Sequence, residues 1–205
     1  MLFLYFMIDT PGMADKRAEI RPTHLAYLAQ EGDRFFAAGP LTDDAGEATL
    51  GNMLIMDWPE RAAAEAWIAG EPYTKGGIFG EVDIHGYLNL WPKGSRPRVK
   101  DGLYAFRNLN GPDAADLRTE NREAHLEYLA STAEHLFAAG PLMDDGWTGD
   151  EPAMDHRVGT LYVVDFPDRN AAGMWLSDEP YAKAGVYAAM SGRAYRNLWP
   201  KNGTD

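Results

Sequence analysis

Apolar and polar positions along the first half of the chain predict strands and helices in a regular order. Residues 2–8 form an apolar run of strand length that ends in turn residues. From Met13 to about Glu31, apolar side chains recur every three or four positions, as on one helical face. Further strands are predicted at residues 34–38, 50–58 and 82–90, and a second helix starts at Pro59. The predicted order is strand, helix, strand, strand, helix, strand.

Three local features refine these elements. Pro22 removes a hydrogen bond inside the first helix, which predicts a kink or a late start there. Its counterpart is Glu123, so we expect a straighter helix in the second half. Gly39 and Pro40 are expected to end the second strand. In the last strand, apolar positions 82, 84, 88 and 90 alternate with polar positions 83, 85, 87 and 89, which predicts one buried face.

The second half of the chain repeats the first. Residues 21–29 (RPTHLAYLA) return 101 positions later as residues 122–130 (REAHLEYLA), and both copies then reach AAGPL and two aspartates. Beyond the aspartates the offset becomes 108, where Glu71-Pro-Tyr matches Glu179-Pro-Tyr and both copies end in NLWPK. Seven extra residues therefore lie in the loop around positions 147–157 of the second half.

Each copy has the order of a ferredoxin-like βαββαβ module, in which both helices cover one face of an antiparallel sheet. The uncovered faces of two such sheets can cover each other. We therefore expect an α+β fold in which the two modules form a pseudo-dimeric α+β barrel within one chain, related by a pseudo-two-fold axis. The predicted boundaries are 1–91 for the first domain, 92–101 for a polar linker and 102–205 for the second domain.

Composition narrows the function classes. With 45% apolar residues, the 205-residue chain can bury a core in each half. A formal charge of −12 disfavours nucleic acid as a partner, and no apolar stretch is long enough to cross a membrane. The opening apolar run lacks a basic leader and a cleavage site, so a cytoplasmic location is expected. The expected partner is a small molecule, and the fold is also compatible with a homo-oligomer of the pseudo-dimer.

Cofactor and metal motifs are missing from the sequence. The chain has no cysteine, no glycine-rich nucleotide loop and no histidine pair at the spacing of a zinc site. We therefore expect no cofactor and no metal. Any chemistry then relies on oxygen and nitrogen side chains. Four tryptophans recur in both halves and are expected to anchor cores or interfaces, or to line a pocket: Trp67, Trp91, Trp175 and Trp199.

The repeated Arg-x-x-His-Leu-x-Tyr-Leu segment, the Gly-Pro-Leu turn and the acidic-Pro-Tyr element together resemble the YciI-like (YCII-related) family. The resemblance spans nearly the whole chain and implies dimeric α+β barrels related in fold to muconolactone isomerases, with a dehydrochlorinase of a chlorinated hydroxyquinol among the members. It also implies a catalytic pair of a histidine with an acid. By motif position these are His24 with Glu71 and His125 with Glu179, where glutamate replaces the family's aspartate.

In this role a histidine acts as general base while the carboxylate orients its ring, as in a metal-free lyase or isomerase. Other repeated polar residues would bind the substrate: the arginines Arg21 and Arg122 an anion, and the tyrosines a developing oxyanion. The candidate substrate-binding residues are Arg21, Asp43, Tyr73, Arg122, Asp144 and Tyr181.

Other interpretations of these residues are open at this stage. Each histidine is equally consistent with a core position. Arg21 is consistent with a simple ion pair to Glu71, and each aspartate pair is consistent with a solvated turn. The whole protein would then be a non-catalytic module that binds a metabolite or a protein. The seven-residue insertion predicts that the two pockets differ, with Trp147 or Met154 partly covering the second.

Overall fold

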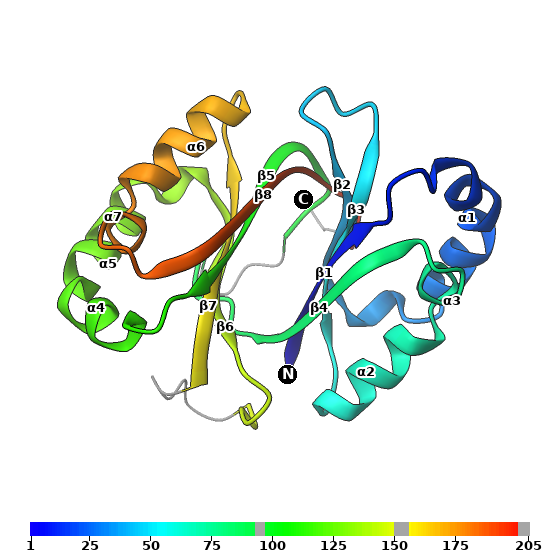
Figure 1. The fold of residues 1–205 in the computed structure, drawn as a ribbon, viewed down its shortest axis with the longest axis horizontal. Helices are drawn as coiled ribbons and strands as arrows, with labels where there is room; N and C mark the ends of the chain where they lie inside the picture. The colour runs from blue at the N-terminus through cyan, green and yellow to red at the C-terminus, as the bar shows by residue number, and fades with distance from the viewer. Residues whose placement is uncertain (93–96, 150–155, 201–205) are drawn as a thin grey trace.

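The computed structural model describes residues 1–92, 97–149 and 156–200, which form one closed barrel flanked by helices. The strands follow the order β1-β3-β2-β8-β5-β7-β6-β4 around the barrel, and neighbouring strands are antiparallel. In Figure 1 the helices of the second half lie at the left, those of the first half at the right, and the strands between them. The predicted pseudo-dimeric α+β barrel is thereby confirmed.

The first half runs from β1 to β4 as predicted, with one extra helical turn after the second helix. That turn holds the Glu-Pro-Tyr element. The elements are β1 (Leu2–Asp9), α1 (Ala14–Ala29), β2 (Phe35–Thr42), β3 (Thr49–Asp57), α2 (Arg61–Gly70), α3 (Pro72–Lys75) and β4 (Phe79–Tyr87), with a 3-10 turn at Gly32–Arg34.

The second half repeats this series with a divided first helix. Its strand β5 begins at Lys100, inside the predicted linker. The elements are β5 (Lys100–Asn110), α4 (Ala114–Glu120), α5 (Arg122–Ser131), β6 (Leu136–Met143), β7 (Arg157–Asp165), α6 (Arg169–Asp178), α7 (Pro180–Lys183) and β8 (Tyr187–Asn197), with a 3-10 turn at Ala133–His135.

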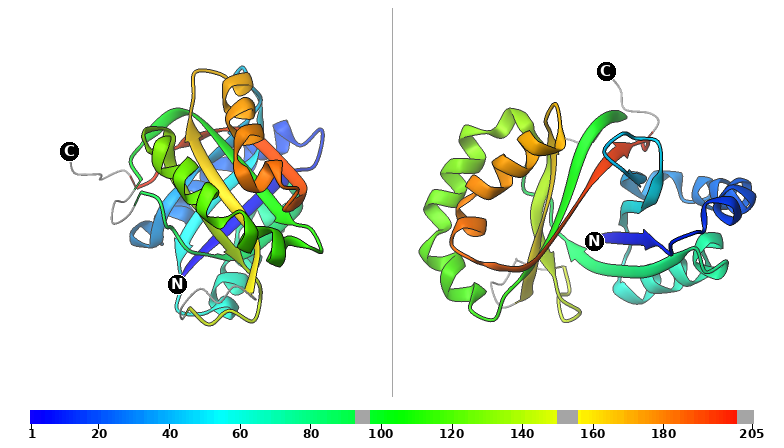
Figure 2. Two further views of the ribbon diagram at one scale, coloured as in Figure 1. Left: turned by 90° about the vertical axis from the view of Figure 1, so that its left-hand side faces the viewer. Right: turned by 45° about the horizontal axis from the view of Figure 1, so that its top comes forward.

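Side chains that alternate along the strands fill three cores. On β1, Leu4 and Phe6 point into the barrel, where they meet residues of both halves such as Met53 and Leu103. The neighbours of these residues on the strands face outward and pack under the helices of their own half. The barrel interior is therefore a core that both halves build together. Figure 2 shows the strands between the helices of the two halves from two further sides.

Two short strand contacts close the barrel between the halves. Leu41 of β2 pairs with Tyr195 of β8, and Tyr87 of β4 pairs with Leu142 of β6. Two ion pairs at equivalent positions also cross between halves, Arg61 with Asp145 at 2.8 Å and Arg169 with Asp44 at 3.2 Å. Because these ion pairs are exposed at their carboxylate ends, the backbone pairing and the shared core contribute more to the union of the halves.

The segment after the last strand of each half crosses onto the other half. The N–H of Leu198 donates to the carbonyl of Ala38 at 2.8 Å, and that of Leu90 donates to the carbonyl of Ala139 at 2.9 Å. Trp199 and Trp91, one residue further along, form isolated bridges with the same two alanines. Each half therefore places a tryptophan beside the other half's helix-covered face.

The last strand of the first half differs from its prediction. β4 ends at Tyr87, before the predicted Leu88 and Leu90, and Val82 is 37% exposed. Residues 83 and 85 lie opposite Phe6 and Leu4 of β1 and therefore share the barrel face. The alternation was correct, and Ile84 on the assigned side packs against the core under the helices. The expectation of one buried face was wrong, because the opposite face of β4 lies on the barrel.

The prediction of a straighter first helix in the second half was also wrong. Helix α1 runs without a break through Pro22, whereas its counterpart is divided at Asn121 into α4 and α5. Asn121 replaces Ile20, and its side-chain amide donates to the carbonyl of Leu117 at 2.8 Å. The backbone N–H of Asn121 donates to the same carbonyl at 3.1 Å, so the side chain and the backbone share one acceptor where the helix divides.

Strand β2 continues through Gly39 and Pro40 to Thr42, so the expected stop at Gly39 was wrong. Pro40 is tolerated because β2 is the outer strand of the first half's own sheet. Gly39 is required by the joint between halves: a Cβ there would lie 1.8 Å from the carbonyl oxygen of Arg196. A Cβ on Gly140 would likewise lie 1.8 Å from the carbonyl oxygen of Leu88, where the first half's last segment crosses onto the second half.

We expect Gly39→Ala to destabilise the protein by at least about 2 kcal/mol, because backbone atoms of the two halves must move apart. Chemical denaturation monitored by circular dichroism measures this change. The matched control is Gly173→Ala in α6, where the added methyl meets nothing within 4 Å and alanine favours the helix. Equal stability of the two variants would contradict the close approach at the joint.

Candidate active site

Each half brings its histidine and its glutamate together. Nδ1 of His24, on α1, lies 2.6 Å from Oε1 of Glu71, and the same two atoms of His125 and Glu179 are also 2.6 Å apart. The His24 and Glu71 side chains are 6% and 1% exposed, and those of His125 and Glu179 are 12% and 0% exposed. These contacts join residues 47 and 54 positions apart in the sequence.

Local helix geometry holds each carboxylate in place. Glu71 follows α2 and is the N-cap of α3, where its side chain accepts a hydrogen bond from the Thr74 N–H at 2.9 Å. Glu179 caps α7 and accepts from the N–H groups of Tyr181 and Ala182, each at 3.1 Å. The following proline fits the first helical position, and the helix start favours a negative charge. Glutamate, although longer than aspartate, thus reaches the histidine.

The contact with the carboxylate determines which histidine nitrogen is available for chemistry. An ionised carboxylate only accepts hydrogen bonds, so Nδ1 donates and the neutral ring has a free lone pair on Nε2. Neither Nε2 has a hydrogen-bond partner within the described parts of the chain. Tyr73 stacks on the His24 ring at 4.0 Å and Tyr181 on the His125 ring at 3.9 Å, so each imidazole is fixed in two directions.

In the first half, His24 faces a cavity of about 670 Å³ that both halves line. Helix α1 supplies Arg17 and Arg21, strand β3 supplies Asn52, and the crossing segment of the second half supplies Trp199. The volume lies within the usual range of small-molecule sites, roughly 300–1,000 Å³. Cationic, aromatic and amide groups therefore surround the imidazole.

Arg17 organises the polar side of this cavity. Its Nη1 lies 2.6 and 2.7 Å from the two carboxylate oxygens of Asp9, its Nη2 donates to Asn52, and its guanidinium lies 4.4 Å from the centre of the Tyr73 ring. Burial raises the pKa of Asp9, and the Arg17 charge opposes that shift. Burial also raises the pKa of Tyr73, opposed by Arg17 and Arg21. The Arg17 charge is thus neutralised inside the protein.

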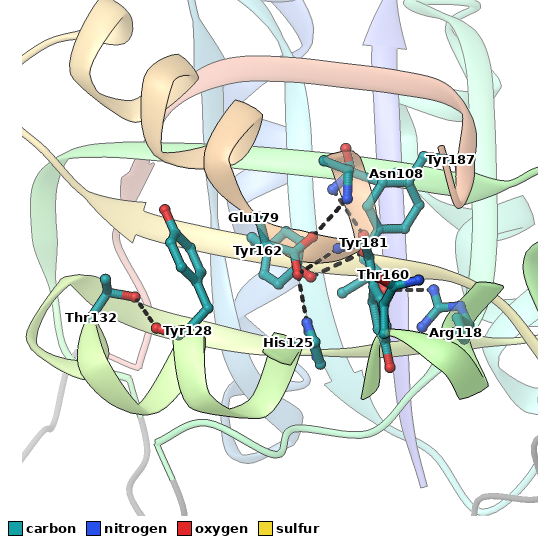
Figure 3. A network of polar contacts seen from close by, with 12 residues as sticks. Asn108, Arg118, His125, Tyr128, Thr132, Thr160, Tyr162, Glu179, Tyr181 and Tyr187 are labelled. Atoms are coloured by element: carbon teal, nitrogen blue, oxygen red, sulfur yellow. Dashed lines mark hydrogen bonds and ion pairs between the residues drawn. The ribbon is translucent and has the colours of Figure 1, made fainter. Parts of the chain in front are cut away.

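The second half contains the same pair beside a cavity of only about 60 Å³. Figure 3 shows His125 reaching Glu179, with Tyr181, Thr160 and Arg118 nearby. Two larger side chains line this cavity where the first half has smaller ones: Tyr162 takes the place of Leu54 and Arg157 that of Thr49. These two substitutions in β7 therefore contribute to the smaller volume of the second cavity.

The two cavities differ, as the insertion predicted, but Trp147 is not the residue that covers the second one. Trp147 does not line the second cavity; its ring packs against Gly86 of β4 and Met143 of β6. Met154 lies outside the described residues. The His125 side chain is also slightly more exposed than that of His24. Trp147 therefore contributes to the joint between the halves.

The other candidate residues fall into two groups. Arg21, Tyr73, Arg122 and Tyr181 line the cavities beside the histidines. Asp43 and Asp144 instead accept backbone hydrogen bonds within the turns that follow β2 and β6, and neither lines a cavity. The expected alternative of an ion pair between Arg21 and Glu71 is absent among the described residues, where Glu71 pairs with His24.

Sequence reasoning missed several residues of the first cavity. Arg17 was detectable, because Arg118 repeats it at the same offset as the histidines. Asp9 and Asn52 are not matched by identical residues in the second half, so the repeat gave no signal for them. Trp199 was recognised as an anchor, but its place beside the first half's histidine depends on how the halves are joined.

The described residues contain neither a metal-binding cluster nor a membrane-spanning helix. No three histidine, aspartate or glutamate side chains gather closely enough there to hold a metal ion. None of the described helices combines the length and the apolar character that crossing a membrane requires.

Comparisons with known proteins agree with this architecture. The E. coli O6:H1 protein YciI is 31% identical over 98 residues, which cover 44% of this chain and all of the relative. A solved 5-chloro-2-hydroxyhydroquinone dehydrochlorinase from Burkholderia phenoliruptrix is 28% identical, covers 43% of this chain and 94% of its own, and has a TM-score of 0.41. A mutant chlorite dismutase from Candidatus Nitrospira defluvii shares only the fold, at 9% identity and a TM-score of 0.59 over 98% of this chain and 91% of its own.

The family model of the YCII-related domain matches residues 1–87 and again residues 97–191. These two matches correspond to the two halves that the internal repeat defines and that each contribute four strands to the barrel. The chain therefore belongs to the YCII-related family and carries two copies of its domain.

Proposed function

We propose that the first-half cavity is the active site of a lyase or isomerase that transfers a proton on a small molecule. His24 is the general base and Glu71 orients it. The observation that carries this proposal is the 2.6 Å bond from Nδ1 of His24 to a buried carboxylate, in a ring that lines a cavity of about 670 Å³. A core histidine would have apolar neighbours and no such space beside it.

In the proposed reaction, Nε2 of His24 takes a proton from a substrate carbon or hydroxyl. The electron pair of the broken bond forms a new double bond, and a leaving group such as chloride departs with its own electron pair. In an isomerisation, the double bond shifts and His24 returns the proton to another carbon. Glu71 stabilises the imidazolium in between, because its buried charge lies against Nδ1.

The cavity lining suggests the substrate class. Arg21 is exposed at the cavity and suits a carboxylate or phenolate, while Trp199 and Tyr73 offer aromatic surfaces to a flat ring. Membership of the family makes chlorinated hydroxyquinols and muconolactone-like acids the first compounds to assay. The His125–Glu179 pair has the same hydrogen-bond arrangement as His24 and Glu71. Its cavity of about 60 Å³, however, is far below the size of ordinary ligand sites. We assign turnover to the first half.

His24→Ala is expected to lower kcat by about 10²–10⁴-fold, the usual contribution of a general base, without unfolding the protein. His125→Ala is the matched control, because it removes the same side chain from the smaller cavity, and should retain turnover. Steady-state rates and thermal melts of both variants measure this. Full activity of His24→Ala would contradict the proposal. Substrate binding without turnover by the wild type would favour a non-catalytic binding module.

Glu71→Gln tests the orienting role separately. The amide keeps the shape of the side chain but cannot stabilise an imidazolium, so kcat should fall while KM changes little. Because Glu71 also caps α3, a melt must accompany the kinetics. A Glu71→Gln enzyme whose KM rises while kcat stays at the wild-type value would show that Glu71 acts only in binding.

Tyr73 is expected to remain a neutral hydrogen-bond donor at alkaline pH. Burial raises its pKa above the usual value, so its proton is lost at higher pH than that of a free tyrosine, which titrates near about 10. Ultraviolet titration of the wild type against Tyr73→Phe measures this. If the two proteins differ by one phenolate that forms below about pH 10, the expectation is wrong.

A further inference from the structure

The second cavity is a different kind of site from the first, and the difference centres on one buried arginine. Arg118 is 3% exposed and occupies the position of Arg17. Its Nε and Nη2 donate to the side-chain oxygen of Asn110 at 3.2 and 2.8 Å, and Nη2 also donates to the hydroxyl of Thr160 at 2.8 Å. Both partners are neutral.

The equivalent arginine of the first half has its counter-ion inside the protein. Arg17 binds both carboxylate oxygens of Asp9, whereas the second half has Asn110 at that position. Within the described residues Arg118 forms no ion pair, and its Nη1 has no hydrogen-bond partner. A buried charge without a counter-ion is costly, so this position favours an anion from solution.

The other charged side chains that line the second cavity are also positive. Every charged side chain among its described lining residues is an arginine: Arg118, Arg122 and Arg157. The first cavity, by contrast, includes Glu47 in its lining. Burial and, less strongly, the charges of Arg118 and Arg122 lower the pKa of Arg157. The carboxylate of Glu179 is hydrogen-bonded to Nδ1 of His125.

We propose that the second cavity binds a small oxyanion, such as inorganic phosphate or a short carboxylate, on the Nη1 face of Arg118. A volume of about 60 Å³ holds about four water-sized groups, which matches the size of such an anion and excludes an aromatic substrate. Arg122 contributes a second cation from the exposed mouth of the cavity, and the hydroxyl of Thr160 orients the arginine. This site is separate from the proposed turnover site.

Isothermal titration calorimetry of the dialysed full chain in a chloride-free, low-salt buffer tests the proposal with phosphate, sulfate and acetate in separate runs. We expect saturable binding of one anion per chain, and the comparison between runs identifies the preferred geometry. In Asn110→Asp, the new carboxylate supplies the counter-ion as Asp9 does for Arg17, so affinity should fall at least tenfold while the protein stays folded. His24→Ala should bind the anion as the wild type does.

Thermal melts provide a second readout, because a ligand that binds only the folded state raises Tm. Phosphate or acetate should raise the Tm of the wild type and leave that of Asn110→Asp nearly unchanged. The reciprocal variant Asp9→Asn removes the internal counter-ion of Arg17 and should create a second anion-dependent increase. Absence of saturable binding by the wild type, or equal binding by Asn110→Asp, would overturn the assignment whatever the activity of the first cavity.

Discussion

The structure depends on the burial of a sheet face that neither half can cover alone. Each YCII-related module places its helices on one side of its strands, and the other side carries apolar residues such as Leu4, Phe6, Leu103 and Leu161. Closing eight strands into one barrel buries both faces together, and closure also removes the exposed strand edges that would otherwise pair with other chains. Fusion of two modules in one chain makes this encounter intramolecular.

Barrel closure also builds the candidate site. The strands alone would leave the cavity beside His24 open on one side, and the segment that follows β8 covers that side with Leu198 and Trp199. The close approach of Gly39 to Arg196 is part of the same crossing. The site is therefore coupled to the joint, because a change that separates the halves also moves a wall of the cavity away from the imidazole.

Much of this architecture was predictable because the repeat provides an internal comparison. The offset of 101 marked the modules, and their element order indicated the ferredoxin-like fold. The pairing of His24 with Glu71 came from the family resemblance, since residues 47 positions apart carry no local signal of contact. The geometry then confirmed that contact. Its catalytic role stays a proposal.

What escaped prediction depends on tertiary context. Pro22 is a stronger helix breaker than Asn121, yet the helix divides at the asparagine, whose side-chain amide donates to the carbonyl of Leu117. The polar positions of β4 looked solvent-facing, but Asp83 lies in the barrel, where it pairs with Arg107 of the other half. A single strand cannot reveal such a partner. Trp147 was assigned to a pocket because its loop is inserted, whereas its ring fills the space above Gly86.

Duplication gave two copies of one arginine, half-buried as Arg17 and buried as Arg118, and a single atom of its partner separates their roles. Asp9 offers Arg17 a counter-ion within the protein, so the first cavity needs no ion on that side and can accept a larger molecule. Asn110 keeps nearly the same shape and hydrogen-bonding position but removes the charge, so electrical neutrality around Arg118 requires an ion from outside. The same fold thus supports a site that is complete by itself and, in its pseudo-symmetric copy, a site that is completed by binding.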